Sequence, residues 1–334
     1  MQQESGRTVI DGLFFYSDGD AGPALAGGIH AVNLTVVNPL SDPTQAFDEI
    51  AAWAKRLRAK GSQWHQVRST SDITEAKSRG RLGLIMGWQD MLPIEDRIER
   101  IALFHELGVR IMQLTYNSAN LIGDGCLERR DAGLTEFGRQ VVAEMNAVGV
   151  AIDLSHCGEK VALDAAQITS KPILLTHANA RAVFERPRNK SDKVIRAVAQ
   201  TGGVIGLSTH GFMNWTTSPA QPPTLEGFVA NVKHVRDLVG IDHIGIGTDH
   251  ATVGDPTAAD SFLTMSKEKF AGTAGDFVSA FGNRLEDRYP KGTPTPREYQ
   301  RILEALSKHG FTSGEIDKIA GGNFLRAFRA IWGA

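Results

Sequence analysis

The sequence predicts a (β/α)8 barrel, in which eight parallel strands form a closed ring inside a layer of helices. Short apolar runs alternate with amphipathic stretches along the whole 334-residue chain. Apolar runs without polar alternation are typical of parallel strands buried on both faces. Two of these runs, VAIDLSH and PILLTH, finish on His156 and His177. Such folds carry their ligand-binding groups at the carboxyl ends of the strands, so this repetition also predicts a site.

Eight segments rich in Val, Ile and Leu and bounded by turn residues are the predicted strands. They cover residues 8–15, 29–37, 82–88, 109–116, 150–156, 172–177, 203–210 and 243–249. The 21 residues from His156 to His177 leave room for a helical crossover between two parallel strands. Eight strands is the number that a closed barrel of this kind requires.

Amphipathic segments between the strands are the predicted outer helices. They cover residues 43–60, 94–108, 135–149, 159–168, 193–202 and 224–240. Thr135 and Ser191 are predicted N-caps, because their hydroxyls can accept from the orphan amides of the first turn. A stretch with Gly, Thr, Pro and Ser at about 250–295 is either a lid or a packing insertion. Helices follow at about 296–333, and residues 1–334 are predicted to form one domain.

The composition favours an ordinary globular protein that acts on a small molecule. Hydrophobic residues make up 42% and charged residues 22% of the chain, enough for a large core. A net charge of -2 supplies no basic field for nucleic acid or anionic lipid. No apolar run reaches the roughly 18 residues that cross a bilayer, and the polar start leaves no room for a signal peptide. We therefore expect no nucleic-acid or membrane partner and a cytoplasmic location.

Polar side chains gather at the predicted strand ends. They are Gln89, Asp90, Tyr116, Asn117, His156, His177, His210, Asp249 and His250. Neutral imidazoles and a carboxylate are the ligand set of catalytic zinc, which keeps one position for water. A carboxylate at the eighth strand, Asp249, could also take a proton from that water and later return it. The alternative is that Asp249, in GTDHAT, only caps a turn.

Several segments, in order along nearly the whole chain, resemble a known family. They are VIDG, SDITEAKSRGRLGLIMGWQD, LGVRIMQLTYNSANLIGDG, GLTEFGRQVVAEMNAVGVAIDLSH, PILLTHANARAVFERPRNKSDKVI, IGIGTDHAT and IAGGNFLRAF. Together they resemble the renal (membrane) dipeptidase family, peptidase family M19, which is similar to amidohydrolases. The resemblance implies a (β/α)8 barrel with two zinc ions that hydrolyses dipeptides, and a homodimer.

Carried over by position, the resemblance implies that His156 and His177 bind one zinc and that Asp249 is the acid/base aspartate. Arg188 and Asn189, in RPRN, fall where the family holds the carboxylate of its substrate. A guanidinium fork suits a carboxylate geometrically. Without the motif around it, Arg188 would be interpreted as a solvated loop charge.

The chain departs from the family at the other metal. The family's first strand ends in Asp-Gly-His-x-Asp, but Leu13 and Phe15 stand at the two ligand positions here. Gln89 replaces the bridging glutamate, and a neutral amide bridges two cations poorly. Tyr116 replaces a histidine thought to contact the tetrahedral intermediate. These departures predict one zinc per chain rather than two.

A single metal needs a third ligand. Asp249 is the first choice, followed by His210, His250 and Gln89. Gln89 and Tyr116 are also predicted to contact substrate. Phe15, with its apolar neighbours, either fills the core or forms an apolar wall of the substrate site.

Three functions follow from these residues. The first is a metal-dependent hydrolase acting on an amide or related bond of a small, carboxylate-bearing substrate. The second is a lyase or isomerase on the same scaffold, with Tyr116 as the acid. The third is a catalytically silent paralogue that binds a ligand.

Overall fold

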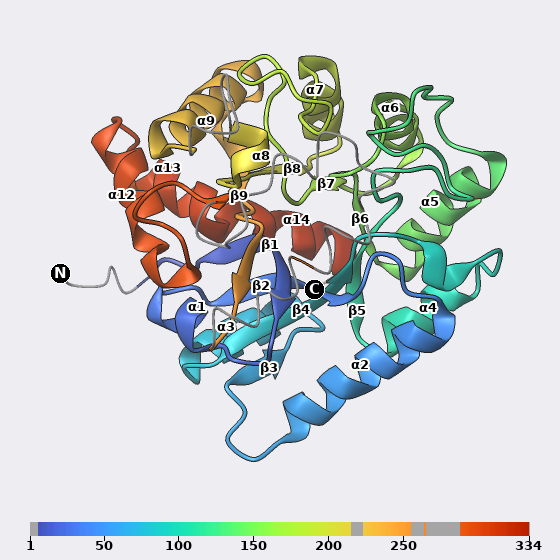
Figure 1. The fold of residues 1–334 in the computed structure, drawn as a ribbon, viewed down its shortest axis with the longest axis horizontal. Coiled ribbons are helices and arrows are strands. Elements are labelled where there is room, and N and C mark those ends of the chain that lie inside the picture. Colours follow the sequence, from blue (N-terminus) through green and yellow to red (C-terminus); the bar gives the residue numbers. More distant parts are fainter. Residues whose placement is uncertain (1–5, 215–222, 255–263, 265–287, 334) are drawn as a thin grey trace.

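The structure, a computed structural model, describes residues 6–214, 223–254, 264 and 288–333, and it confirms the predicted barrel (Figure 1). Each of the eight ring strands overlaps one predicted strand. They are β1 (Ile10–Ser17), β2 (Ala31–Val37), β4 (Leu82–Trp88), β5 (Val109–Gln113), β6 (Ala151–Asp153), β7 (Leu174–Leu175), β8 (Val204–Leu207) and β9 (Ile244–Ile246). Neighbouring strands pair in parallel, and the pairing of Ile246 with Asp11 closes the ring between β9 and β1.

Two further strands lie outside the predicted set. β3 (Trp64–Gln66) pairs with β4 beside the ring, and β10 (His250–Thr252) pairs with β1, where His250 lies opposite Phe14. Each is three residues long, and the sequence WHQ of β3 offers no apolar run to mark it as a strand.

The strands β6, β7 and β9 are shorter than predicted because the ends of their runs leave the main-chain ladder. Asp153 Oδ1 accepts from the amides of Ser155 (2.9 Å) and Thr176 (3.0 Å). Asp11 Oδ1 accepts from the amide of Thr248 (3.0 Å) in the same way. These carboxylates replace main-chain carbonyls as acceptors, so the strand ends diverge without leaving buried amides unpaired.

The predicted outer helices are confirmed with shifted ends. They are α2 (Pro43–Arg58), α4 (Arg100–Glu106), α5 (Glu136–Val148), α6 (Glu159–Ile168), α7 (Asp192–Gln200) and α9 (Leu225–Val239). Helix α4 begins six residues later than predicted, because a short 3-10 helix (Leu92–Ile94) occupies the start of that segment. Both predicted N-caps are in place: Thr135 Oγ1 accepts from Gly138 N (2.9 Å) and Ser191 Oγ from Val194 N (3.4 Å). The shorter helices α1 (Gly22–Ala26), α3 (Thr70–Ser78) and α8 (Gly211–Asn214) were not predicted.

Three helices end the chain, and the last of them closes the amino-terminal end of the ring. They are α12 (Gln300–Lys308), α13 (Ser313–Asp317) and α14 (Asn323–Trp332), with a π-helical turn (Lys318–Gly322) before the last. Phe324, Phe328 and Ile331 of α14 share one buried cluster with inward residues of the strands, such as Ile10 and Leu174. Figure 1 accordingly shows α14 across the centre of the ring. The barrel interior is therefore a packed core at this end.

The predicted insertion at about 250–295 lies largely outside the described residues. Those of its residues that the structure describes are 250–254, 264 and 288–295. Within the described parts of the chain, no helix is both long and apolar enough to cross a membrane.

Candidate functional site

The two histidines that end the β6 and β7 runs meet at the carboxyl end of the ring, as predicted. His156 and His177 are both buried, and their Nε2 atoms lie 3.0 Å apart. Their ring centroids are 5.0 Å apart, with the planes tilted by 53°. The meeting follows from adjacent parallel strands that end at the same edge of the barrel.

Hydrogen bonds at the opposite ring nitrogens assign the tautomer of each histidine. His156 Nδ1 lies 2.7 Å from Asn117 Oδ1, which can only accept, so Nδ1 carries the proton. The Thr176 hydroxyl donates to Asp153 Oδ2 (2.6 Å), so its oxygen accepts from His177 Nδ1 (2.8 Å). Both Nε2 atoms therefore present lone pairs to each other with no hydrogen between them.

This donor set fits a metal ion. The 3.0 Å separation of the two nitrogens is short enough for both to bind one ion at the usual Zn–N distance of about 2.0 Å, and neutral imidazole is a preferred zinc ligand. Burial, reinforced by the charge of Arg188, holds the pKa of His156 and of His177 well below the ordinary value. Both rings are therefore neutral at pH 7, which is the ligand form.

The predicted third ligand is not in place beside the two imidazoles. Among the described residues, no third His, Cys, Asp or Glu brings a ligand atom within 4.8 Å of both Nε2 atoms. Asp249 follows β9, on another part of the ring, where its amide donates to Leu13 O (3.0 Å). Its φ of 60° lies in the left-handed region, a strained conformation that is common at functional sites.

The Asp249 carboxylate interacts with the charges at the carboxyl end of the ring, which we call the barrel mouth. Burial raises its pKa to about 7, against the opposing charges of Arg188 and Arg288. A carboxyl group with a pKa near neutrality can both take and return a proton at physiological pH. The geometry thus suits Asp249 to acid/base work better than to metal ligation.

Tyr116 covers one face of the histidine pair. Its ring stacks on His156 at a centroid distance of 4.2 Å and an angle of 26°. Its amide donates to Asp90 Oδ2 (2.7 Å), which fixes the start of the loop after β5. Burial, together with the Asp249 charge, raises the pKa of Tyr116, so the phenol keeps its proton. Asn117, the partner of His156, has a strained φ of 63°.

Arg188 and Asn189, the predicted carboxylate-binding residues, are buried and hydrogen-bond to main-chain carbonyls. The Arg188 guanidinium donates from Nη1 to Ser155 O and from Nη2 to His177 O (2.9 Å). It therefore ties together the segments that follow β6 and β7, while its charge stays close to the histidines. The Asn189 amide donates to Phe184 O (2.8 Å) and Met213 O (3.1 Å), so its donors hold loops rather than a ligand.

His210 and His250 form a second group around Tyr289. Their ring centroids lie 5.6 Å and 4.0 Å from that of Tyr289. His210 Nδ1 accepts from Phe212 N (3.3 Å), which leaves its proton on Nε2. His250 Nε2 donates to Thr293 O (3.2 Å), and no described residue hydrogen-bonds its Nδ1. Neither histidine joins the pair formed by His156 and His177.

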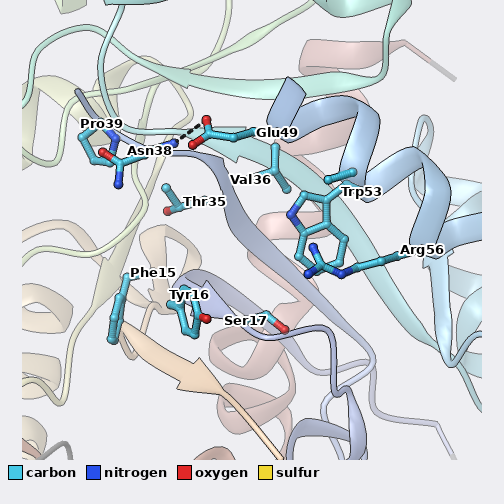
Figure 2. Close-up of a pocket in the computed structure, with 11 residues that line it drawn as sticks. Phe15, Tyr16, Ser17, Thr35, Val36, Asn38, Pro39, Glu49, Trp53 and Arg56 are labelled. Atoms are coloured by element: carbon cyan, nitrogen blue, oxygen red, sulfur yellow. Dashed lines mark hydrogen bonds between the residues drawn. The ribbon is translucent and has the colours of Figure 1, made fainter. Parts of the chain in front are cut away.

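The residues of β1 near the mouth, which we call the β1 side, have two roles: some fill the core and one lines a hollow. Leu13 and Phe14 are completely buried, which is core filling. Phe15 is partly exposed and lines a hollow of about 220 Å³ between the ends of β1 and β2 and helix α2. Figure 2 shows Phe15 at one end of this hollow, with Trp53 and Arg56 at the other.

Gln89 lies at the edge of that hollow. Its Nε2 donates to Thr35 Oγ1 (2.9 Å), and Thr35 is one of the lining residues. No histidine lines the hollow. Gln89, which follows β4, is thus hydrogen-bonded to a residue that lines the hollow, and it brings no charge there.

An unrelated cluster on the outside of the barrel also has metal-ligand chemistry. Ligand atoms of His65, Asp72 and Glu75 lie within 4.8 Å of one another. The Asp72 carboxylate, however, accepts from the amides of Arg68 (2.8 Å) and Ser69 (2.7 Å) and so caps helix α3. We therefore assign the Asp72 carboxylate to helix capping.

Sequence reasoning missed four contributors to the mouth: Asp153, Thr176, Arg288 and Tyr289. The signal for Asp153 was present, because an Asp interrupts the apolar run VAIDLSH three residues before the histidine. Arg288 and Tyr289 follow the long segment after β10, where no pattern marks them.

Comparisons with known proteins agree with the fold. The family model described as membrane dipeptidase (peptidase family M19) matches residues 24–261. Dipeptidase tcpJ of Claviceps purpurea is 25% identical over 288 residues, which are 85% of this chain and 59% of that protein. Dipeptidase verJ of Clonostachys rogersoniana is 32% identical over 185 residues, which are 55% of this chain and 47% of that protein. The chain thus spans about half the length of these relatives.

Solved structures extend the similarity over the whole chain. An amidohydrolase from Pseudomonas aeruginosa is 33% identical with a TM-score of 0.85, covering 98% of this chain and 97% of the other. A metallo peptidase from Rhodobacter sphaeroides is 19% identical with a TM-score of 0.79, covering 98% and 99% of the two chains, and it shows the fold alone. Because the family model covers well over half of its residues, the chain belongs to the membrane dipeptidase family, peptidase family M19.

Proposed function

We propose that this protein is a hydrolase that uses one zinc ion to cleave the amide bond of a dipeptide or a related small substrate with a free carboxylate. The observation that carries the proposal is the 3.0 Å approach of two unprotonated, neutral Nε2 atoms at the barrel mouth. Membership of the dipeptidase family supports hydrolysis over a lyase, an isomerase or a silent paralogue.

His156 and His177 would hold the ion through Nε2. Zinc bound there would supply Lewis acidity and would lower the pKa of a coordinated water toward neutrality. The proposal of a single ion rests on the β1 side, where Leu13 and Phe15 have no metal-ligating atom and Gln89 has no charge. Its neutral amide would instead contact substrate through Oε1, because its Nε2 is held by Thr35.

Asp249 would move the proton. With a pKa of about 7, its carboxylate can accept a proton from the attacking water and return it to the leaving amine nitrogen. The Tyr116 ring is positioned by stacking on His156, and its hydroxyl keeps its proton. This hydroxyl would donate a hydrogen bond to the substrate oxygen on which negative charge develops in the transition state.

Two guanidinium groups would recognise the substrate carboxylate. Arg188 and Arg288 both oppose the rise in the Asp249 pKa, so both charges reach the mouth. Each Nη of Arg188 donates one hydrogen bond to a main-chain carbonyl, and the guanidinium has further N–H groups that could donate to a carboxylate oxygen. Phe15, in the hollow beside Gln89, would contact the side chain of the substrate.

The test is hydrolysis of a dipeptide panel by metal-free protein titrated with zinc. We expect no activity without metal and full activity at one equivalent. Dipeptide amides, which lack the carboxylate, should be worse substrates by roughly tenfold or more, since a hydrogen bond to a charged group contributes about 1.5–3 kcal/mol. Activity that requires two equivalents would refute the single ion, and inactivity on the whole panel would refute the peptidase. The homodimer and the cytoplasmic location stay predictions.

A further inference from the structure

We infer that Asp153 and Thr176 are a positioning pair that holds the His177 imidazole in its metal-binding tautomer, an inference that rests on the proposed zinc site. Thr176 is the middle of a chain of hydrogen bonds that runs from the Asp153 carboxylate through the hydroxyl to His177 Nδ1. No part of this chain touches the Nε2 side of the ring, where a metal would bind.

The Asp153 carboxylate determines the direction of the chain. It is completely buried and accepts from the amides of Ser155 and Thr176 and from both of their hydroxyls, each O···O distance being 2.6 Å. Because the single hydroxyl hydrogen of Thr176 points to Asp153, only its lone pair faces His177 Nδ1 at 2.8 Å. The imidazole must place its hydrogen on Nδ1 to make this bond.

The alternative tautomer would abolish the metal site without moving any atom except one hydrogen. A hydrogen on His177 Nε2 would point at His156 Nε2, 3.0 Å away, and the two rings would bind each other. The Thr176 hydroxyl therefore decides whether the histidine pair faces a cation or closes on itself.

The backbone around Thr176 is fixed by close packing at the centre of the ring. A Cβ added to Gly12, Gly206 or Gly247 would lie 2.3, 2.1 or 1.9 Å from Thr176 O. These glycines lie on or directly after β1, β8 and β9, so three strands approach one carbonyl group. The hydroxyl is thus presented from a position that cannot shift toward them.

We call an Asp carboxylate that accepts from two main-chain amides and from a Thr hydroxyl at the end of another strand a clamp. A second clamp of this kind occurs at Asp11 and supplies a matched control. Asp11 accepts from the amides of Leu13 (3.0 Å) and Thr248 (3.0 Å) and from the Thr248 hydroxyl (2.8 Å). The residue after Thr248 is Asp249, which has no ring nitrogen to donate to the hydroxyl. Removal of the Thr248 hydroxyl should cost the same buried hydrogen bond but leave the histidine tautomers unchanged.

The first experiment reads the tautomers directly, by NMR of metal-free protein labelled with ¹⁵N-histidine. In the wild type we expect His177 with its proton on Nδ1, and in T176V a shift of that proton to Nε2. T176S, which keeps the hydroxyl, and T248V should resemble the wild type. A wild-type His177 protonated on Nε2 would overturn the inference whether or not any variant folds.

The second experiment measures the dissociation constant for zinc by competition with a chelator. T176V should bind zinc about 10- to 100-fold more weakly, as expected when an outer partner of a ligand is removed, with T176S and T248V close to the wild type. Equal weakening in T176V and T248V would show a general structural effect and contradict the inference. If the wild type binds no zinc, the proposed function fails, and the NMR result still decides the tautomer.

Discussion

The β6–β7 side of the barrel mouth and the β1 side each contain an Asp–Thr clamp with the same hydrogen bonds, but the side chains that follow the two clamps differ. On one side Asp153 and Thr176 lead to His177, and on the other Asp11 and Thr248 lead to Asp249. The hydrogen-bond patterns of the two clamps correspond atom for atom at the amides and the hydroxyl. In the proposed one-zinc site, metal binding would therefore depend on a few strand-end side chains and not on the hydrogen-bonded backbone beneath them.

The two sides also contribute differently to stability. On the β1 side, Leu13 and Phe14 are completely buried, and burial of such a side chain contributes about 1.5–3 kcal/mol. On the β6–β7 side, two neutral imidazoles face each other with unshared lone pairs, an arrangement that needs an ion to be favourable. The β1 side has the character of a core, and the β6–β7 side that of a site.

The largest expected effect comes from removing one histidine of the pair. H177A should lose zinc, and hydrolysis should fall roughly a thousandfold or more, because the metal supplies several kcal/mol and each 1.36 kcal/mol is tenfold. H65A is the control, since it disrupts the outer cluster with Asp72 and Glu75. Zinc retained by H177A and lost by H65A would place the ion outside the barrel mouth.

Asp249 separates acid/base chemistry from metal ligation. D249N should lower kcat by about 10²- to 10⁴-fold, the contribution of a positioned acid or base, and should still bind zinc. Steady-state kinetics and metal content of the same preparation check both expectations. Loss of zinc in D249N would make Asp249 a ligand instead.

The β1 side has a histidine of its own that should act only on stability. Burial lowers the pKa of His250 to about 3, whereas the unfolded chain has the ordinary value near 6.5. Between these values the unfolded state binds a proton that the folded state refuses, so stability decreases as pH falls from 6.5 toward 3. At pH 5 this loss is about 2 kcal/mol.

Denaturant unfolding of wild type and H250Q at pH 7 and pH 5 measures that contribution. Gln can still donate to Thr293 O, the acceptor of His250 Nε2. H250Q should lose less stability than the wild type on acidification, by about 2 kcal/mol. An identical pH dependence in the two proteins would show that His250 does not titrate as its burial implies.

The smallest expected effect is a change in zinc content, and it tests whether side chains alone decide which side of the mouth binds metal. The triple variant L13H/F15D/Q89E restores the ligand types that the family pattern has at these positions. Its zinc content should rise from one to two equivalents, because the Asp11–Thr248 clamp is already present. L13N/F15N/Q89E is the matched control of similar polarity. One equivalent in both variants would mean that the β1 backbone also differs from a metal site.

The fold and the histidine pair were predictable from sequence for one physical reason. Apolar runs buried on both faces identify parallel strands, and neighbouring parallel strands present their last residues at one edge. His156 and His177 therefore had to meet once β6 and β7 were recognised. Strand lengths were overestimated because side chains of Asp153 and Asp11 replace main-chain acceptors at the ends, which no periodicity reveals.

The remaining site residues depend on geometry across the ring. The separation of Asp249 from the two imidazoles and the use of Arg188 on Ser155 O and His177 O are set by tertiary packing. Arg288 enters the mouth from the far end of a long segment without a motif. Sequence patterns specify which strand end a residue follows, but not which partner its side chain reaches.

The most direct test of one zinc at the β6–β7 side is anomalous diffraction at the zinc absorption edge, from crystals of protein loaded with excess zinc. We expect one strong peak at the barrel mouth, bonded to His156 Nε2 and His177 Nε2, and no peak beside Leu13 and Phe15. A second peak on the β1 side, or a zinc peak only at His65, would contradict the assignment.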